Sequence, residues 1–257
     1  MDSTRFSGRT ALITGGTNGF GRATAELLVA GGARVLVTGR TATSIEETRA
    51  TLGQRAVVVR SDAASLSDTV ALADRARAEL GELDLLFVNA GIARSASLAE
   101  TDEAVYDEVF ATNTRGVRHQ HQRCLLHRAG TRSAHRRRRR RGDVDVGGER
   151  QGPAADERLR GQQGRAALDG ADLRPRVAAT RVRVNAISPG PIDTGVLERS
   201  LPAEVVERSR AQMVANNPMA RFGRNEEVAR AVAFLAFDAT YTTGAELPVD
   251  GGVSQLL

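Results

Sequence analysis

Hydrophobic and polar positions alternate along the first part of the chain in two different rhythms. Short apolar runs occupy residues 10–14, 33–37, 56–59 and 83–88, and apolar residues recur at helical spacing within residues 23–30, 66–80 and 104–112. A series in which short strands alternate with helices is typical of right-handed βαβ units that share one parallel sheet. The pattern therefore predicts an α/β fold.

A glycine-rich turn joins the first predicted strand to the first predicted helix. Residues Thr14–Gly21 read TGGTNGFG, and Gly31 and Gly32 follow the helix. Glycines allow a backbone to approach a pyrophosphate closely, and the N-terminus of a helix offers it free N–H groups and the positive end of the dipole. Glycines alone would indicate only a loop, but their position between a strand and a helix predicts a dinucleotide site.

Polar or small residues also follow the other predicted strands, at the edge of the sheet where a dinucleotide binds. These residues are Thr38, Gly39, Arg40, Asp62, Ala63, Asn89, Ala90 and Gly91. An acidic residue after the second strand would hydrogen-bond the ribose 2′-OH of NAD, whereas an arginine there accommodates the 2′-phosphate of NADP. Gly39 stands in the place of the acid and Arg40 follows it, so we expect NADP rather than NAD. The alternative is that Arg40 is an ordinary solvated surface residue.

Several ordered motifs in this chain resemble those of the short-chain dehydrogenase/reductase family. TGGTNGFG resembles the family fingerprint TGxxxGxG, Asn89–Gly91 resembles its NAG motif, and Asn113 stands where the family has the Asn of its catalytic tetrad. Residues 182–194 (VRVNAISPGPIDT) resemble the family's sixth strand with its PG motif, and residues 247–252 (LPVDGG) resemble its closing strand. The resemblance covers Phe6–Gly116 and Arg181–Leu257, and it implies one Rossmann-like, doubly wound domain over residues 1–257.

The resemblance also implies how the chain would bind its ligands. The cofactor-binding residues would be Thr14, Gly15, Thr17, Asn18, Gly19, Phe20, Gly21, Thr38, Arg40, Asp62, Ala63, Asn89, Ala90, Gly91, Pro189, Gly190, Ile192 and Thr194. Within this set, Asp62 would contact the adenine, and Ile192 and Thr194 would contact the nicotinamide amide. Leu197–Phe222 would form a mobile lid over a small-molecule carbonyl or alcohol substrate. By the same resemblance the protein would be a homotetramer or a dimer.

The residues that would perform the chemistry are largely missing. The family transfers a hydride, with a Tyr as general acid/base and a Lys four residues later on the same helix face, where its charge lowers the pKa of the phenol. This chain contains no lysine, and neither of its tyrosines, Tyr106 and Tyr241, begins a YxxxK motif. Of the four catalytic positions only Asn113 is present, so we expect catalysis to be impaired.

The missing motif should fall in Val117–Thr180, a segment of different composition. The segment holds 16 of the 36 basic residues, 7 of the 31 acidic residues, all four histidines and the single cysteine, Cys124. Its net charge is +9 in a chain of net charge +5, so the remainder carries −4. Six consecutive arginines, Arg136–Arg141, stand where a fifth strand should enter the core, and burying even one unpaired guanidinium is costly. We therefore expect the fifth strand and the following helix to be disrupted.

A shifted reading frame would explain this segment. An arginine-rich chain without lysine indicates GC-rich coding, in which displaced frames spell Arg, Ala, Gly and Pro. Synonymous codons exist for residues 156–168 whose displaced frame reads TSVYGASKAALR, which resembles the family's YxxxK helix. The same displacement places the family's Ser at Val146, its Tyr at Leu159 and its Lys at Gln163, and it turns the arginine run into a valine strand.

Other interpretations of the segment lead to different functions. A nucleic-acid patch would normally interleave aromatic residues, and the segment has no Phe, Tyr or Trp. The histidines and Cys124 match no familiar zinc spacing, so we expect no metal and no nucleic-acid partner. A disordered Arg/Gly-rich insertion is compatible with the composition. The alternative to an impaired oxidoreductase is a catalytically inactive NADP-binding pseudoenzyme or scaffold.

Composition also bears on the compartment. No apolar run approaches the roughly 20 residues of a membrane span, and the N-terminal residues contain no signal-peptide core. A single cysteine excludes an internal disulfide and fits a reducing environment. We expect a cytoplasmic protein without a membrane partner.

Overall fold

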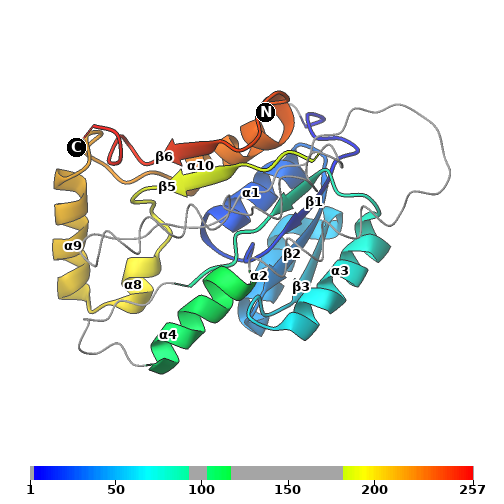
Figure 1. Cartoon of the computed structure of the whole chain (residues 1–257), viewed down its shortest axis with the longest axis horizontal. Helices are drawn as coiled ribbons and strands as arrows, with labels where there is room; N and C mark the ends of the chain where they lie inside the picture. Colours follow the sequence, from blue (N-terminus) through cyan, green and yellow to red (C-terminus); the bar gives the residue numbers. More distant parts are fainter. Residues whose placement is uncertain (1–2, 93–102, 117–181, 257) are drawn as a thin grey trace.

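Four parallel strands in the first part of the chain form one sheet (Figure 1). The computed structural model describes residues 3–92, 103–116 and 182–256. The strands β1 (Thr10–Ile13), β2 (Arg34–Gly39), β3 (Ala56–Arg60) and β4 (Leu85–Phe87) are hydrogen-bonded in the order β3-β2-β1-β4. The chain crosses from one side of β1 to the other between β3 and β4. In a doubly wound sheet such a switch marks the ligand crevice, at the carboxyl ends of the strands.

Helices connect these strands. They are α1 (Gly19–Ala30), α2 (Ala42–Leu52), α3 (Leu66–Leu80) and α4 (Glu103–Phe110); a 3₁₀ turn (Gly53–Arg55) follows α2, and a wider helical turn (Ala111–Gly116) follows α4. Hydroxyl side chains cap two of the helices: Oγ1 of Thr41 accepts from the N–H of Ser44 (3.4 Å), and Oγ of Ser65 accepts from the N–H of Asp68 (3.1 Å). The starts of α2 and α3 are therefore encoded locally.

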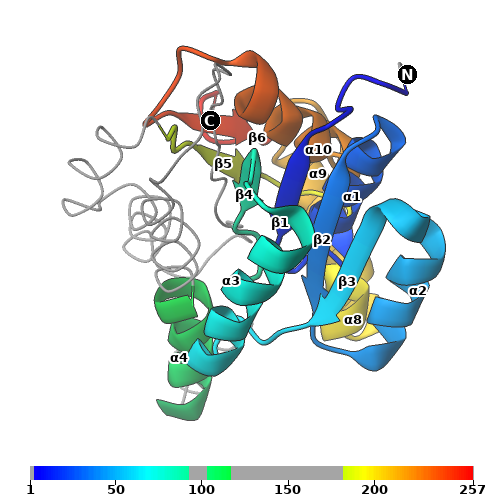
Figure 2. The ribbon, with the colours of Figure 1, turned by 90° about the vertical axis from the view of Figure 1, so that its right-hand side faces the viewer.

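Successive residues of the strands face two separate hydrophobic layers. Ile13, Val37 and Phe87 are buried on one face together with residues of α1 and α2. Leu12 and Leu36 are buried on the other face against α3, which crosses the front of the sheet in Figure 2. Helices therefore cover both faces, as in a doubly wound fold.

The last part of the chain adds a two-stranded parallel sheet. β5 (Ala186–Pro189) pairs with β6 (Glu246–Val249), and the helices between them are α8 (Val196–Ser200), α9 (Ala203–Ala215) and α10 (Asn225–Ala233), with a wider helical turn at Phe234–Asp238. Within the described ranges no strand joins β4 to β5. Backbone hydrogen bonds of described strands therefore do not link the two sheets.

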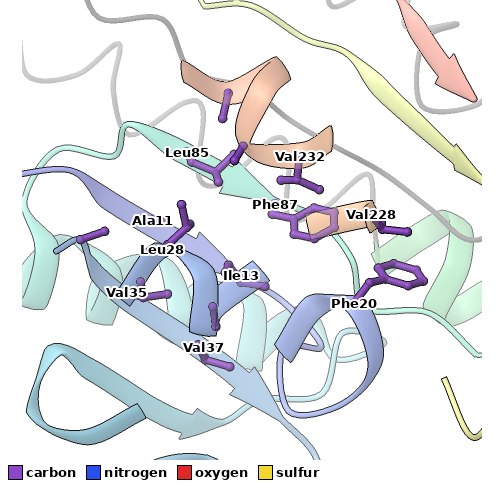
Figure 3. Close-up of a cluster of buried hydrophobic side chains, with 14 of the residues drawn as sticks. Ala11, Ile13, Phe20, Leu28, Val35, Val37, Leu85, Phe87, Val228 and Val232 are labelled. Carbon is purple, nitrogen blue, oxygen red and sulfur yellow. The ribbon is translucent and has the colours of Figure 1, made fainter. Parts of the chain in front are cut away.

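Packing between α1 and α10 joins the two sheets instead. Phe20 of α1 and Val228 and Val232 of α10 belong to one buried cluster with Phe87 of β4 and Ile187 of β5. Figure 3 shows the side chains of α1, α10 and the first sheet turned toward one another. The two sheets therefore share a hydrophobic core.

A buried arginine links the residues that follow α10 to the segment that precedes β5. Arg183 is 9% exposed, and its guanidinium donates to the carbonyls of Leu235 (2.7 Å), Ala236 (2.7 Å) and Ala239 (2.9 Å). Burial lowers the pKa of Arg183. The carbonyls lie at the negative end of the α10 dipole, so they replace the water that this side chain has lost.

The α/β, doubly wound class predicted from the sequence is confirmed, and α3 has the predicted bounds. The expected end of the second strand was wrong, because Thr38 and Gly39 pair with Val59 and Arg60 of β3 and so belong to β2. The hydrophobic pattern does not predict α2 or α10. The expected disruption of the fifth strand and its helix concerns residues 117–180, which lie outside the described residues. None of the described helices combines the length and the apolar character needed to cross a membrane.

Candidate functional site

The turn between β1 and α1 is built around the hydroxyl of Thr14. Thr14 is buried, and its N–H donates to the carbonyl of Phe87 (3.0 Å). Its Oγ1 accepts from the backbone N–H groups of Asn89 (3.1 Å) and Ala90 (3.2 Å). The end of β1 is thereby fastened to the end of β4, and the two segments predicted to bind phosphate and ribose lie side by side.

Two glycines of this turn approach neighbouring atoms too closely to carry a side chain. A Cβ on Gly15 would lie 2.7 Å from Cα of Ala90, and one on Gly21 would lie 2.4 Å from Nδ2 of Asn89. That Nδ2 donates to the carbonyls of Thr14 and Gly15, both at 3.0 Å. The side chain of Asn89 therefore holds the turn, and the glycines are required by this packing as well as by any ligand.

The N-terminus of α1 has no side-chain cap. Asn18 precedes the helix, and its exposed side chain donates to Oγ1 of Thr17 (3.3 Å) instead of accepting from the helix. Phe20 is 7% exposed and packs into the core, so it can offer only its backbone to a ligand. Uncapped N–H groups and the helix dipole favour an anion at this point, such as a pyrophosphate.

The end of β2 lies next to the same turn. Oγ1 of the buried Thr38 accepts from the N–H of Gly15 (3.2 Å), so this hydroxyl is used within the protein. A Cβ on Gly39 would lie 2.4 Å from Cγ2 of Thr17, which leaves no room for an acidic side chain. Arg40 is exposed and has no side-chain partner among the described residues. Its guanidinium is free to bind a phosphate group.

Asp62 and Ala63 lie in a tightly hydrogen-bonded loop after β3. The N–H of Asp62 donates to Oδ2 of Asp68 (2.8 Å), and Oδ1 of Asp62 accepts from the N–H of Ala64 (3.0 Å). The hydrogen bonds from the backbone of Asp62 and from the Ser65 hydroxyl lower the pKa of Asp68. Ala63 is 8% exposed. The loop holds Asp62 beside the carboxyl end of the sheet.

Asn113, the one predicted catalytic residue in the described part of the chain, braces the segment after β4. Its Oδ1 accepts from the N–H of Ile92 (2.9 Å), and its Nδ2 donates to the carbonyl of Ile92 (2.8 Å). Both groups of the amide are therefore engaged by the backbone next to Gly91. The positions expected for the Ser, Tyr and Lys, namely Val146, Leu159 and Gln163, lie outside the described residues.

The loop after β5 is fixed to the start of α10. The N–H of Gly190, which follows Pro189, donates to the carbonyl of Val249 (3.1 Å). Ile192 forms an isolated parallel bridge with Gly223, whose carbonyl accepts from the N–H of Asp193 (2.9 Å). Nδ2 of Asn225 donates to the carbonyl of Asp193 (2.9 Å). The sequence predicts no role for Asn225. The one feature that could have indicated it is that this polar residue stands at the start of a helix, shortly after a glycine.

This loop borders the start of α1 and leaves two buried polar atoms unpaired. A Cβ on Gly19 would lie 3.3 Å from Cγ2 of Thr194 and 3.8 Å from Oδ1 of Asn225. Oγ1 of Thr194 and Oδ1 of Asn225 are shielded from solvent and have no hydrogen-bond partner within the described ranges. An unpaired buried polar atom costs about 1–3 kcal/mol. Together with the uncapped helix, these atoms fit a polar ligand that spans the glycine turn and this loop.

No metal centre was expected from the sequence. The described residues contain no group of three or more His, Cys, Asp or Glu side chains that could hold a metal ion. All four histidines and Cys124 lie outside these residues.

The geometry defines a doubly wound α/β fold with a glycine-rich turn of the kind that binds dinucleotides, and comparisons with known proteins give the family. Residues 9–133 match the family model described as short chain dehydrogenase, and residues 175–254 match the one described as enoyl-(acyl carrier protein) reductase. The chain belongs to the short-chain dehydrogenase/reductase family of enzymes.

Individual relatives match nearly the whole chain. It is 38% identical to the cis-4-hydroxycyclohexanecarboxylate dehydrogenase of Sinomonas cyclohexanicum, covering 96% of this chain and 97% of that protein. It is 33% identical to the 3-oxoacyl-[acyl-carrier-protein] reductase FabG of Escherichia coli K12, covering 96% and 98%. The crystal structure of a short-chain glucose/ribitol dehydrogenase from Brucella melitensis superposes with a TM-score of 0.81 at 26% identity, covering 98% of both chains.

The two family matches leave a gap inside the compositionally different segment. The first match ends at residue 133 and the second begins at residue 175. The arginine run and the positions expected for the catalytic Ser, Tyr and Lys all fall between them. The first match also continues past Val117, so the departure from the family pattern begins later than the change in composition suggests.

Proposed function

We propose that this chain binds NADP and derives from an oxidoreductase that reduces a carbonyl or oxidises an alcohol, with catalysis impaired in the chain as written. The end of β2 carries the choice of cofactor. Gly39 packs against Thr17 so closely that no acid fits there, and the exposed Arg40 follows directly. A guanidinium without an acid beside it suits a 2′-phosphate better than a bare ribose 2′-OH.

Each part of the cofactor has residues suited to it. The start of α1 in the turn Thr14–Gly21 suits the pyrophosphate, since no side chain caps its first N–H groups and glycines flank it. Asp62 with Ala63 would contact the adenine, and Asn89–Gly91 would lie beside the ribose. Pro189–Thr194 would hold the nicotinamide ring, next to the unpaired Oγ1 of Thr194.

The bound cofactor would supply or accept the hydride, and the protein must move the accompanying proton. The chain has no lysine, and its two tyrosines are exposed: Tyr106 is 51% exposed on α4, and Tyr241 is fully exposed. Neither tyrosine is followed by a lysine or an arginine four residues later. Asn113 already donates to and accepts from Ile92. We therefore expect cofactor binding without efficient proton transfer.

The gap between the two family matches supports this reading, because it covers the positions where the Ser, Tyr and Lys are expected. A displaced reading frame would restore those residues in order. The second candidate function is an NADP-binding pseudoenzyme or scaffold. It is favoured by a glycine-rich turn suited to a dinucleotide in a chain that has no YxxxK motif. In both cases we propose a cytoplasmic protein that acts on, or derives from one that acts on, a small carbonyl or alcohol. Its dimer or tetramer would be weakened if the fifth strand is disrupted as the sequence predicts.

Binding of NADPH and NADH by isothermal titration calorimetry tests the cofactor assignment. We expect NADPH to bind about 10–100-fold more tightly, because a charge-assisted contact to the 2′-phosphate contributes about 1.5–3 kcal/mol. Arg40→Ser should abolish the preference. Arg77→Ser, the same change on the exposed side of α3, should preserve it. Equal affinities for the two cofactors in the unaltered chain would refute the role of Arg40.

Turnover separates the enzyme from the pseudoenzyme. The names of the relatives suggest cis-4-hydroxycyclohexanecarboxylate with NADP⁺, and a 3-oxoacyl thioester with NADPH, as test substrates. We expect no turnover by the purified chain, so activity that persists through purification would contradict the proposed impairment. The coding sequence of residues 117–181, translated in its displaced frame and expressed, should restore turnover if the chain is a damaged reductase. A repaired chain that binds NADPH and stays inactive would favour the scaffold.

A further inference from the structure

Asn225 is fixed in one orientation at the first position of α10. Its Nδ2 donates to the carbonyl oxygen of Asp193 at 2.9 Å. The reverse assignment of the amide would place Oδ1 against that carbonyl oxygen, so the hydrogen bond determines which end faces which neighbour. Oδ1 of Asn225, which can only accept, is therefore the atom turned toward the start of α1.

Asp193 is hydrogen-bonded through three of its groups, namely the N–H, the carboxylate and the carbonyl, and these interactions differ in strength. Its N–H donates to the carbonyl of Gly223 (2.9 Å), and its carboxylate accepts two hydrogen bonds from Arg210, both at 3.1 Å. The side chains of Arg210 and Asp193 are 32% and 50% exposed, so water screens this ion pair and weakens it. The hydrogen bond from Asn225 acts on the peptide that leads directly into Thr194. Together with the hydrogen bond from the N–H of Thr194 to the carbonyl of Ile192 (2.9 Å), it fixes the orientation of that peptide.

Thr194 and Asn225 present complementary groups around one point. Cγ2 of Thr194 and Oδ1 of Asn225 both border the position that a Cβ would occupy on Gly19, at 3.3 Å and 3.8 Å. Oγ1 of Thr194 is unpaired among the described residues, and so is Oδ1 of Asn225. A change of χ1 rotamer in Thr194 moves its hydroxyl into the position now occupied by its methyl group. The hydroxyl then borders the same position beside Gly19 as Oδ1 of Asn225, an acceptor without a donor among the described residues.

We propose that Asn225 is a positioning residue that aims the hydroxyl of Thr194 at the carboxamide of the nicotinamide. Its Nδ2 donates a hydrogen bond to the carbonyl of the peptide between Asp193 and Thr194. Its Oδ1 accepts a hydrogen bond from the hydroxyl of Thr194. The lone pairs of Thr194 Oγ1 are then directed at an amide N–H of the ligand. This inference rests on the proposed binding of NADP, and it adds a residue outside the motifs that predict the cofactor site.

The test compares NADPH with 2′,5′-ADP, which carries the adenine and the 2′-phosphate but no nicotinamide. Calorimetry is carried out on the full chain and on Asn225→Leu, Thr194→Val and the double variant. Asn216→Leu makes the same change at an exposed position at the end of α9 and serves as the control. We expect Asn225→Leu to weaken NADPH binding about five- to tenfold, the effect of one lost hydrogen bond, and to leave 2′,5′-ADP binding unchanged. The double variant should bind NADPH as Thr194→Val does, because both changes remove one interaction.

Three other outcomes would refute either the positioning role of Asn225 or the proposed binding of NADP. Equal weakening of both ligands by Asn225→Leu would mean a general structural effect and would refute the positioning role. Additive losses in the double variant would show that Asn225 acts independently of Thr194, which also refutes it. If the unaltered chain binds neither ligand, the proposed NADP function itself fails. Should Asn225→Leu not fold, Asn225→Ala removes the amide without adding bulk, and the same pair of ligands decides.

Discussion

Replacing Gly15 by alanine tests whether the cofactor turn depends on its close approach to the segment after β4. Gly15 (φ +63°) and Gly53 (φ +64°) have nearly the same backbone conformation. A Cβ on Gly15 would lie 2.7 Å from Cα of Ala90, whereas no described atom lies within 4 Å of one on Gly53. The left-handed conformation costs an alanine about 1–2 kcal/mol at either position. At Gly15 two backbone segments must also move apart, and such overpacking adds about 1–3 kcal/mol.

Gly15→Ala should therefore lose about 2–5 kcal/mol of unfolding free energy, against about 1–2 kcal/mol for Gly53→Ala. In a chain of 257 residues each kcal/mol lowers the Tm by about 2–4 °C, so circular dichroism melts resolve the difference. NADPH affinity should fall in Gly15→Ala and stay unchanged in Gly53→Ala, because only the first moves the N–H groups of the turn. Equal losses of stability in the two variants would refute the argument that the contact with Ala90 requires a glycine.

Three further predictions concern the second half of the fold. Arg183→Met should lower the unfolding free energy by about 3 kcal/mol or more, since each buried carbonyl left unpaired costs about 1–3 kcal/mol. Arg230→Met, at an exposed position of α10, is the control. Similar denaturant midpoints for both variants would contradict the role of Arg183. The hydrogen bonds that Glu227 accepts from Arg221, and from the backbone N–H of Arg224, lower its pKa from 4.5 to about 2. Glu227→Gln should therefore reduce stability at neutral pH, and the deficit should disappear as the pH falls from 4.5 toward 2; urea titrations that show a constant deficit would contradict this. Arg210→Met should lower the unfolding free energy by less than about 1 kcal/mol at low salt and by still less at high salt, because the ion pair between Arg210 and Asp193 is half exposed. A loss of stability that does not depend on salt would argue against an electrostatic contribution.

The sequence predicts those parts of the fold whose buried faces carry several apolar residues. The bounds of α3 follow from its spacing, since Leu72, Ala76 and Leu80 line one face against the sheet. α2 escapes prediction because one of its three buried residues is Thr48, whose hydroxyl donates to the carbonyl of Ser44 (2.6 Å) within the helix. A buried polar residue whose hydrogen bond is made within its own helix does not contribute to the hydrophobic pattern of the sequence.

The candidate site divides along a similar line. The glycine turn and Asn89–Gly91 can be located from the sequence because each is a short contiguous motif directly after a strand. The proximity of Asn225 to Gly19 cannot be predicted from the sequence, since it exists only because α1 and α10 pack together. The sequence also predicts neither the exclusion of an acid at Gly39 by Thr17 nor the engagement of Asn113 with Ile92, because both depend on side chains meeting across loops.

The contact between α1 and α10 has a consequence for how the protein should be handled. In the described part of the chain the two sheets meet through apolar packing, and a ligand lying across Gly19 and Thr194 would touch both sides of that interface. Its binding free energy would then count toward folding, by about 2.7 kcal/mol at a free concentration of 100 times Kd. We expect hydrogen exchange along β5 and α10 to slow when NADPH is added. A preparation stripped of nucleotide would in that case be a looser molecule than the one present in a cell that supplies it.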